Sequence, residues 1–399
     1  MRILYLSNKA PFPPKDGGSI ATLALVNSFA RAGHETTVLA MNTRKHHVTP
    51  FEIPEEITSR TILHLAEVPA RITFWGALKN FFFSRLPYNA ERFIDKNYRK
   101  SLEILLMSHH YDVIQLEGLY VTPYIPVIRK YSKSLIVYRS HNIEHQIWQR
   151  MVKHAHGVKK LYLQILTRRL RRFEESAINQ YDLLVPITAR DEMYLNRMGN
   201  TKPSLVIPAG VDLSSSKMEE LPFEMNLFTI GALDWAPNQE GIEWFLDECF
   251  PSVIPQIPHV RFKVAGRNAP DWFVEKLNRS NVDYMGEVED ASLFMQQNGV
   301  MVVPLLSGSG MRVKIVEGMS NKKPIVTTTV GCEGIEAENG KHIFITDDPS
   351  EFSKYVVTLL NDKELVKTVG EAASQFIFEN YDNQQLTREL LSFYTNHLQ

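Results

Sequence analysis

Short apolar runs alternate with amphipathic stretches from the first residues of the chain. The run Ile3–Leu6 is followed by a loop rich in Pro and Gly, a helical pattern over Ser19–Ala32 and a second apolar run, Thr36–Met41. This order predicts a strand, a loop, a helix and a strand, which is the building block of a parallel sheet.

The second half of the chain repeats this plan. The run Leu227–Ile230 is followed by a loop with Pro237 and Asn238, a helical pattern over Glu240–Phe250 and the run Val260–Ala265. Because the same unit stands near the expected start of each half, we predict an α/β protein with two Rossmann-like, doubly wound domains. Further strands are predicted over Val113–Leu116, Leu135–Tyr138, Leu183–Ile187, Met301–Leu305 and Pro324–Thr329.

The domain boundary is predicted at the turn-rich segment Ile207–Asp212 and the polar run Ser214–Glu220 that follows it. We expect an N-terminal domain over residues 1–207, a C-terminal domain over 208–380 and a helix over 381–399 that can return to the N-terminal domain. In open parallel sheets, ligands bind beyond the carboxyl ends of the strands. We therefore expect the two domains to face each other across a cleft.

Composition and charge predict a soluble, cytoplasmic protein. Of the 399 residues, 44% are hydrophobic and 22% are charged, which is an average globular composition. The 44 basic and 45 acidic residues leave no overall field to attract nucleic acid. Two cysteines argue against a disulfide framework, and no secretory signal or membrane-spanning run is recognisable.

The segment Ser307–Met319 carries the sharpest chemical pattern. Its glycines follow a predicted strand and precede a helix, so backbone N–H groups can approach a phosphate there. Arg312 and Lys314 add two cations that suit a diphosphate, and Glu317 can accept both hydroxyls of a ribose. The same spacing also fits a plain surface helix in which Lys314 and Glu317 form an ordinary i,i+3 pair.

The same glycines are a weak match to a dinucleotide site. Gly308 and Gly310 are the first two glycines of a G-x-G-x-x-G pattern, but Val313 occupies the third position. The pattern also lies far from the first strand of either domain, which argues against an NAD-dependent dehydrogenase. The paired histidines lack the carboxylate or thiolate spacing of a zinc site, so we expect no metal.

Other candidates follow predicted strands of the N-terminal half. Gly17, Gly18 and Ser19 open the first helix and can offer N–H groups and a hydroxyl to an anion, although a helix N-cap by Ser19 is the more frequent role of this pattern. His141 can donate to a ligand oxygen or take a proton, or it can be a solvated loop residue. Glu117 places an acidic group at the same sheet edge.

The run Trp148–Arg172 combines basic and apolar residues. As an amphipathic helix it can lie peripherally on anionic lipid at the inner face of a membrane, helped by the aromatic segment Ile72–Phe83. The other interpretation is a solvated helix that packs its apolar stripe inward.

Several segments together resemble the family 4 glycosyltransferases of the GT-B fold, in particular the polysaccharide-type sugar transferases. They span nearly the whole chain in the order of that family. They are Pro13–Gly18, Ser140–Glu144, Ile207–Asp212, Gly231–Asn238, Gly308–Glu317 and Gly331–Ile335.

The resemblance implies a nucleotide-diphosphate sugar as donor, held mainly by the C-terminal domain. It implies a glycan or lipid-linked acceptor, bound mainly by the N-terminal domain, and no nucleic acid, metal or other cofactor. Transfer is expected to retain the anomeric configuration and to serve polysaccharide or glycan biosynthesis. A non-catalytic two-domain sugar-binding protein is the rival of a different class.

The resemblance also implies individual roles. Glu317 matches the second glutamate of the E-x7-E motif, a ribose ligand, and Ser309 stands where the first glutamate would be, which leaves the sugar open. Arg312 and Lys314 match diphosphate contacts, and His141 matches the histidine at the donor sugar. The further donor-side positions are Gly17, Gly18, Ser19, Gly286, Val288, Ser309, Gly310 and Met311. The acceptor-side positions are Asp16 and Glu117.

Overall fold

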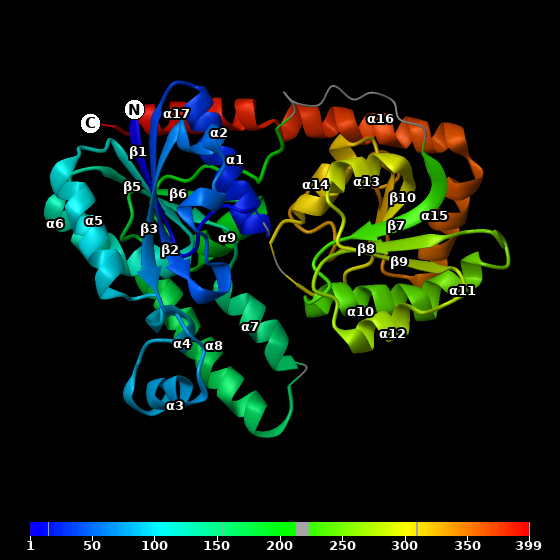
Figure 1. Cartoon of the computed structure of the whole chain (residues 1–399), viewed down its shortest axis with the longest axis horizontal. Coiled ribbons are helices and arrows are strands. Elements are labelled where there is room, and N and C mark those ends of the chain that lie inside the picture. Colours follow the sequence, from blue (N-terminus) through cyan, green and yellow to red (C-terminus); the bar gives the residue numbers. More distant parts are fainter. Residues whose placement is uncertain (15, 154, 213–222, 309, 399) are drawn as a thin grey trace. The chain divides into compact units, whose positions relative to one another are not determined.

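The computed structural model describes residues 1–14, 16–153, 155–212, 223–308 and 310–398. The chain divides into two compact units (Figure 1). Unit 1 comprises Met1–Gly210 and Asn383–Gln399, and unit 2 comprises Val211–Asp382. The C-terminal helix therefore belongs to the same unit as the first strand. The polar run predicted at Ser214–Glu220 lies outside the described residues.

Unit 1 contains a six-stranded sheet in which every neighbouring pair is parallel. The strand order is β3-β2-β1-β4-β5-β6, so the order reverses between β1 and β4. This is the order of a doubly wound, Rossmann-like sheet. The strands are β1 Arg2–Ser7, β2 Glu35–Thr43, β3 Thr61–Val68, β4 Val113–Glu117, β5 Leu135–Ser140 and β6 Leu183–Pro186.

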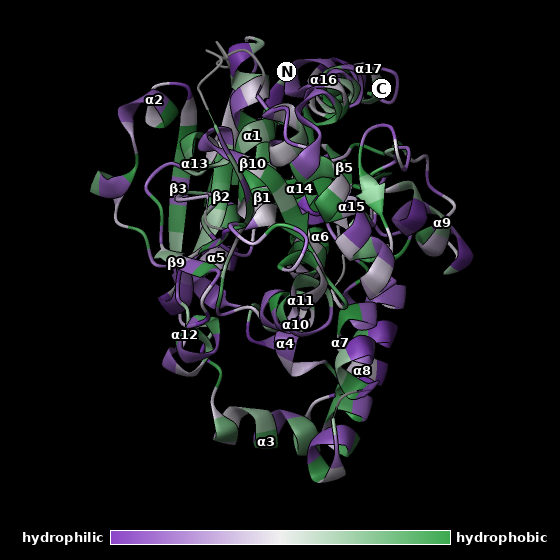
Figure 2. Ribbon diagram, turned by 90° about the vertical axis from the view of Figure 1, so that its right-hand side faces the viewer, coloured by the Kyte–Doolittle hydropathy of each residue, from purple (hydrophilic) through white to green (hydrophobic). Residues whose placement is uncertain are grey.

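Helices cover both faces of this sheet, so its central strands are buried at nearly every position and are mostly hydrophobic (Figure 2). The helices are α1 Gly17–Arg31, α2 Glu55–Thr58, α3 Phe74–Phe83, α4 Tyr88–Glu91, α5 Lys96–Ser108, α6 Ile125–Tyr131, α7 Glu144–Lys153, α8 Gly157–Ala177, α9 Ala189–Arg197 and α17 Asn383–Thr395. Short 3-10 turns are η1 Arg44–His46, η2 Pro50–Glu52 and η3 Leu119–Tyr124.

Strand β1 shows how one short segment serves two cores. Its odd-numbered residues Ile3 and Tyr5 belong to a cluster with Phe29 of α1 and Tyr394 of α17. Its even-numbered residues Leu4 and Leu6 belong to a second cluster, which includes residues of α5 and α6. Because side chains alternate along a strand, a run apolar at every position must be covered on both sides.

Unit 2 repeats the same topology with the strand order β12-β11-β10-β7-β8-β9 and parallel pairing throughout. Its order reverses between β7 and β10. The strands are β7 Glu224–Ile230, β8 Phe262–Ala265, β9 Val282–Gly286, β10 Asn298–Val303, β11 Ile325–Thr327 and β12 Phe344–Ile345. The predicted α/β class with two doubly wound sheets is confirmed.

The helices of unit 2 are α10 Ala236–Trp244, the π-helix η4 Phe245–Cys249, α11 Phe250–Val253, α12 Asp271–Leu277, α13 Ala291–Gln297, α14 Val313–Ser320, α15 Pro349–Asn361 and α16 Lys363–Asn380. The aromatic rings of Phe245, Phe250, Phe262 and Phe352 lie close together in its core. The helix predicted over Glu240–Phe250 is thus interrupted by a π-turn, next to Pro251 in the sequence.

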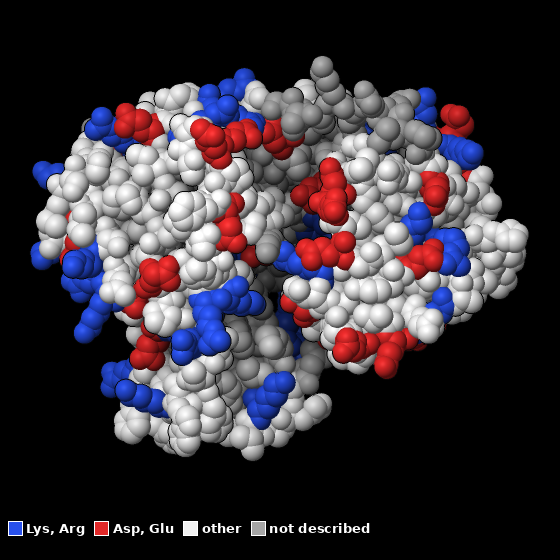
Figure 3. Space-filling view, in the orientation of Figure 1, with Lys and Arg blue, Asp and Glu red and all other residues white. Residues whose placement is uncertain are grey.

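Acidic and basic side chains are interspersed over the face drawn in Figure 3, as the balanced net charge suggests. Among the helices the structure describes, none is both long and apolar enough to span a bilayer. The single helix predicted over Trp148–Arg172 is wrong, because α7 ends at Lys153 and α8 starts at Gly157, a residue with a positive φ of 56°. Glycine adopts that conformation without strain.

Candidate active site

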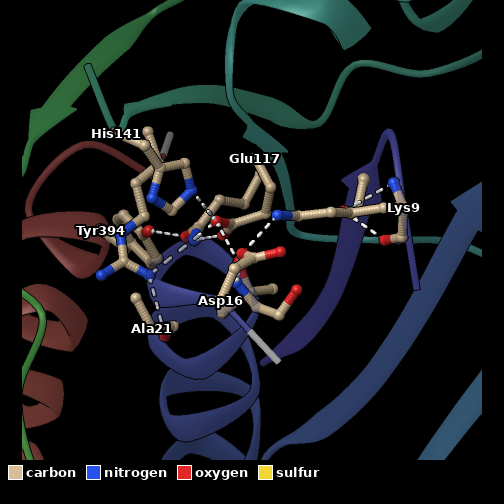
Figure 4. Close-up of polar contacts among 11 residues, drawn as sticks. Lys9, Asp16, Ala21, Glu117, His141 and Tyr394 are labelled. Carbon is tan, nitrogen blue, oxygen red and sulfur yellow. Dashed lines mark hydrogen bonds and ion pairs between the residues drawn. The ribbon is translucent and has the colours of Figure 1, made fainter. Parts of the chain in front are cut away.

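The reversal of strand order in unit 1 gathers polar side chains at one edge of the sheet. The carboxyl ends of β1 and β4 are neighbours there, with Ser7 opposite Glu117, and Glu117 is in turn opposite Arg139 of β5. Doubly wound sheets bind ligands at this reversal. Figure 4 shows the polar contacts that link these residues.

Glu117 lies at the centre of a buried network. Its Oε2 accepts a hydrogen bond from Thr22 Oγ1 at 3.0 Å and lies 2.7 Å from His141 Nε2. The same oxygen is 3.9 Å from Nη1 of Arg139, whose side chain is only 1% exposed. Glu117 therefore compensates a buried guanidinium and holds an imidazole at the same time (Figure 4).

Burial alone would raise the pKa of Glu117. The charge of Arg139 and hydrogen bonds from His141 and Gln115 outweigh burial and lower the pKa to about 2. Gln115 is itself held by the hydroxyl of Tyr394 from the C-terminal helix. The carboxylate is thus ionised at neutral pH and fixed from two sides.

The acceptor-side role predicted for Glu117 needs correction. Its side chain is 2% exposed, and its oxygens are engaged by Thr22, Gln115, Arg139 and His141. A carboxylate so enclosed has no surface to offer an acceptor. We therefore assign Glu117 to positioning His141.

His141 follows the carboxyl end of β5, and its side chain is 15% exposed. Binding of Nε2 to Glu117 fixes the ring orientation and leaves Nδ1 as the nitrogen available to a ligand. Gly118 lies alongside, since a Cβ built there would be 3.8 Å from His141 Cδ2. The alternative of a solvated loop histidine is wrong, because the ring is paired with a buried carboxylate.

Asp16 caps the N-terminus of α1. Its Oδ1 accepts a hydrogen bond from Ser19 N at 3.0 Å and also pairs with the ammonium of Lys9. Burial opposes ionisation of Asp16, but the Lys9 charge and these hydrogen bonds lower its pKa. The first backbone bond within the helix runs from Ile20 N to Asp16 O, so Gly17 N and Gly18 N precede it.

This geometry changes the role of Ser19. The N-cap is Asp16 and not Ser19, the Ser19 amide is occupied by Asp16, and the Ser19 side chain is buried. Ser19 is therefore removed from the anion-binding set, while Gly17 and Gly18 stay in it. Asp16 uses only Oδ1 in both contacts, so its acceptor-side role stays a prediction that depends on Oδ2.

A second acidic group near this edge comes from the start of α7. Glu144 accepts a hydrogen bond from Tyr120 Oη at 2.8 Å, and its amide donates to Glu174 at 3.0 Å. Burial raises the pKa of Glu144 to about 7, with the Glu174 charge adding to the rise and Tyr120 and Lys9 opposing it. A carboxyl that titrates near neutrality can exchange a proton or bind a hydroxyl.

In unit 2 the loops after β7 and β10 meet at the corresponding reversal. Lys314 Nζ donates to Asn238 Oδ1 at 2.9 Å, and Ser307 Oγ donates to Glu240 Oε2 at 3.0 Å. Gly231 leaves room for this contact, because a Cβ there would lie 3.3 Å from Lys314 Nζ. The start of α14 is thereby joined to the start of α10 through Lys314, the cation predicted to bind a diphosphate.

Arg312 is buried at the end of the glycine-rich loop. Its guanidinium lies 5.8 Å from the centroid of the Trp235 ring, and its Nη1 donates to Gly310 O. At Gly308, with φ of 120°, a Cβ would be 2.8 Å from Arg312 Nη2. The glycine is therefore needed for the guanidinium to fold back between the loop and Trp235.

Lys314 and Glu317 both have pKa values moved toward neutrality. Burial, with a smaller contribution from the Arg312 charge, lowers the pKa of Lys314 to about 7. Burial raises the pKa of Glu317, one turn further along α14, to about 7. Perturbed pKa values of this kind are found more often at functional sites than elsewhere. The ordinary Lys314–Glu317 surface pair is not among the contacts of the described residues.

The remaining donor-side positions are spread around unit 2. Gly286 ends the edge strand β9 with a positive φ of 67°, and its carbonyl accepts a hydrogen bond from Gly266 N at 2.7 Å. Val288 is partly buried two residues later. Met311 is 8% exposed, so its side chain belongs to the core and only its backbone can face a ligand. Gly310 has φ of 78°, and Ser309 lies outside the described residues.

Across the described ranges, no three His, Cys, Asp or Glu side chains are grouped so that they could hold a metal ion.

Comparisons with known proteins identify the class. Residues 15–215 match the family described as Glycosyltransferase Family 4, and residues 224–362 match Glycosyl transferases group 1. Sucrose-phosphate synthase of Thermosynechococcus elongatus has a TM-score of 0.72 at 15% identity over 99% of each chain. HepE of Anabaena, solved with UDP-glucose, has a TM-score of 0.66 at 13% identity over 99% of this chain and 100% of its own.

A full-length relative is an uncharacterized 44.6 kDa protein in the cps region of Klebsiella pneumoniae. It is 23% identical over 395 residues, which cover 96% of this chain and 97% of that protein. The two parallel α/β sheets and these likenesses define a GT-B glycosyltransferase. The chain belongs to Glycosyltransferase Family 4.

Some residues of the site were missed from the sequence. Lys9 follows strand β1 and Arg139 lies near the end of β5, so their place at a carboxyl edge was the signal that could have found them. Gln115 and Tyr394 had no such signal, because they are 279 residues apart and meet only in the folded unit.

Proposed function

We propose that this glycosyltransferase moves a sugar, with retention of configuration, from a nucleoside-diphosphate sugar to a hydroxyl of a glycan or lipid-linked acceptor in polysaccharide biosynthesis. The observation that carries the proposal is the pair of cations at the strand reversal of unit 2, the buried Arg312 and the partly buried Lys314. Neighbouring like charges disfavour each other, and a diphosphate supplies the opposite charge. The Anabaena structure solved with UDP-glucose supports this donor class.

Unit 2 is assigned to the nucleotide. Arg312 and Lys314 bind the diphosphate oxygens, and the Glu317 carboxylate accepts the ribose hydroxyls. In unit 1, the Gly17 and Gly18 amides at the positive end of α1 suit a phosphate, and His141 Nδ1 suits a sugar hydroxyl. Family membership favours this assignment over a non-catalytic sugar-binding protein and over an NAD-dependent dehydrogenase.

The chemistry requires stabilisation of a leaving diphosphate. The bond from the anomeric carbon to the diphosphate oxygen breaks, and its electron pair stays on that oxygen. The acceptor oxygen attaches on the same face of the sugar, and its proton passes to the released phosphate oxygen. Negative charge on the diphosphate grows as the bond breaks, so fixed cations stabilise the transition state more than the bound donor.

Glu144 is assigned to the acceptor. Glu144→Gln should raise the acceptor KM up to about tenfold at a pH above 7, where the Glu144 carboxyl is mostly ionised and is replaced by an amide that accepts hydrogen bonds more weakly. Initial-rate kinetics with varied acceptor measure this effect, and the donor Kd should stay unchanged. Glu175→Gln, on the surface of α8, is the matched control. An unchanged acceptor KM in Glu144→Gln would remove Glu144 from the acceptor site.

Donor affinity should be greatest near pH 7. Above that pH, Lys314 loses its charge, and below it, Glu317 becomes protonated, so each limb should weaken binding by up to about tenfold per pH unit. The groups that face Lys314 are Arg312 and Asn238, neither of which titrates in this range. Calorimetric titration with nucleoside diphosphate from pH 5.5 to pH 9 measures the profile.

Substitutions assign each limb of that profile. Lys314→Arg keeps a positive charge at all these pH values and should abolish the alkaline limb, while Glu317→Gln should abolish the acid limb. If neither substitution changed the pH dependence of donor affinity, groups other than Lys314 and Glu317 would be responsible for it.

A thermal-shift screen of nucleoside diphosphates tests the donor class directly. A ligand at 100 times its Kd adds about 2.7 kcal/mol to the free energy of unfolding of the unit that binds it. The best nucleotide is then used as a sugar conjugate, and the anomeric configuration of the product is read by NMR. An inverted product would overturn retention while leaving the donor assignment intact.

A further inference from the structure

Helix α3 exposes its aromatic residues to solvent. The exposed fractions are 74% for Phe74, 76% for Trp75, 67% for Phe82 and 86% for Phe83, and Ile72 just before the helix is 75% exposed. These five residues are called the aromatic face below. Contiguous apolar surface of this kind marks a docking site more often than a surface that stays in water.

The helix is firmly attached by its opposite side. Arg169 of α8 donates from Nη1 to Asn80 O at 3.1 Å and from Nη2 to Phe81 O at 2.7 Å. Asn80 also donates to Leu86 O at 3.0 Å, and the Phe81 ring lies 6.1 Å from that of Tyr162. The aromatic face is therefore exposed because Asn80 and Phe81 are the residues that pack inward.

All charged residues in the two sequence segments around the aromatic face are basic. Residues 71–86 contain three Lys or Arg and no acidic residue, and residues 157–173 contain six Lys or Arg and no acidic residue. Lys79, Arg85, Lys159 and Lys160 are exposed. In Figure 3, Lys and Arg side chains lie at the end of unit 1 that carries α3 and α8.

In the structure, the exposed apolar surface is mainly on α3 and not on α8, the helix expected from the sequence to lie on lipid. The apolar residues Leu163, Leu166 and Leu170 of α8 are buried in small clusters of unit 1, so the apolar stripe of this helix is not available to lipid. Its start is different, because Val158 is 85% exposed and Leu161 is 58% exposed. The exposed apolar surface is thus α3 with the first turn of α8, and α8 otherwise contributes charge.

We propose that the aromatic face docks unit 1 on an anionic lipid bilayer. The rings of Phe74, Trp75, Phe82 and Phe83 enter the boundary between headgroups and acyl chains, and the Lys and Arg side chains around them bind the headgroups. A bilayer supplies both an apolar layer and a dense negative surface, which matches the two properties found together here. An acidic protein partner would satisfy the charges but would need its own apolar pocket for four separate rings.

Co-sedimentation of the full chain with vesicles tests the proposal. The wild-type protein should pellet with phosphatidylcholine vesicles that contain about 30% phosphatidylglycerol and stay in solution with pure phosphatidylcholine. The double substitution Trp75→Ser/Phe83→Ser should reduce the bound fraction at least tenfold. Lys159→Glu/Lys160→Glu should also reduce it, with the largest difference from wild type at low salt, where charges are least screened. Phe51→Ser is the matched control, since Phe51 is fully exposed elsewhere in unit 1.

Two results would overturn the proposal. One is failure of the wild-type protein to pellet with anionic vesicles at low salt, and the other is equal pelleting by Trp75→Ser/Phe83→Ser and wild type. If the protein bound an acidic protein but not anionic vesicles, that result would also overturn the proposal. Thermal shift by nucleoside diphosphate should be the same in all these variants, so the proposed transfer reaction stands or falls separately.

Discussion

Lys314→Ala lowers kcat/KM for the nucleotide sugar by about 10- to 150-fold. The estimate follows from about 1.5–3 kcal/mol for a charge-assisted hydrogen bond, at about 1.4 kcal/mol for each factor of ten. Part of the loss should be a higher donor KM, because Lys314 pairs with the bound diphosphate, and part a lower kcat, because the diphosphate charge grows as the glycosidic bond breaks. Steady-state kinetics with varied donor measure both constants.

Substitution of Lys314 should change activity and thermal stability in opposite directions. Burial lowers the pKa of Lys314 from 10.5 to about 7, so the charged ammonium is less stable in the folded chain than in the unfolded one. This penalty is present at pH below 7 and fades as pH rises from about 7 to 10.5. Lys314→Met should therefore raise the melting temperature at neutral pH, by about 2–4 °C per kcal/mol, while weakening donor binding.

Lys367→Ala is the matched control for these measurements, because Lys367 is an exposed lysine on α16 of the same unit. It should leave kinetics and melting temperature unchanged. Full activity in Lys314→Ala would contradict the donor assignment. A melting temperature lowered by Lys314→Met would show that Lys314 has a structural role instead.

Glu117→Gln should lower the free energy of unfolding by about 3–5 kcal/mol. The substitution leaves Arg139 buried, at 1% exposure, without the negative charge that compensates it. Urea unfolding followed by fluorescence measures the loss. Glu35→Gln is the control, since its ion pair with Arg2 is at the surface and should contribute well under 1 kcal/mol.

A double substitution distinguishes the fold role of Glu117 from its role at His141. Glu117→Leu/Arg139→Met removes both buried charges and should recover much of the stability lost in Glu117→Gln. His141 would still lack its partner, so kcat should stay low. Recovery of kcat together with stability would show that Glu117 acts on the fold alone.

The pH dependence of stability supplies an independent check. The folded pKa of Glu117, about 2, is below the ordinary value of 4.5. Its contribution to stability is therefore complete above about pH 4.5 and is lost as the pH falls from there toward 2. Glu117→Gln should remove that part of the acid transition.

Most central strands could be predicted because a strand covered on both faces is built mainly of apolar residues. β1, β4 and β10 contain such apolar runs, Ile3–Leu6, Val113–Ile114 and Val300–Val303. The edge strands β3, β9 and β12 were missed. Partial exposure gives β3 and β9 a mixed pattern in which Ile62 and Tyr284 face solvent, and β12 has only two residues. The break between α7 and α8 was missed because the repeating pattern of apolar and basic residues continues across it.

The candidate site could be predicted where chemistry is local in sequence. Arg312, Lys314 and Glu317 follow one another on a single loop and helix, so a glycine-rich segment after a strand was enough to select them. The network at Glu117 could not be predicted, because Thr22, Arg139 and Tyr394 reach it from three separate elements. Ser19 was misassigned because either Asp16 or Ser19 can cap a helix, and spacing alone does not decide between them.

The central claim is that a nucleoside diphosphate restores the positive charge of Lys314 beside Arg312. Calorimetric titration at about pH 8, in buffers of different ionisation enthalpy, measures the protons exchanged on binding. At that pH, Glu317 is mostly ionised already and Lys314 mostly neutral, so wild type should take up close to one proton per nucleotide. Lys314→Met should take up none and bind far more weakly. Equal affinity and no proton uptake by the wild-type protein would contradict the account.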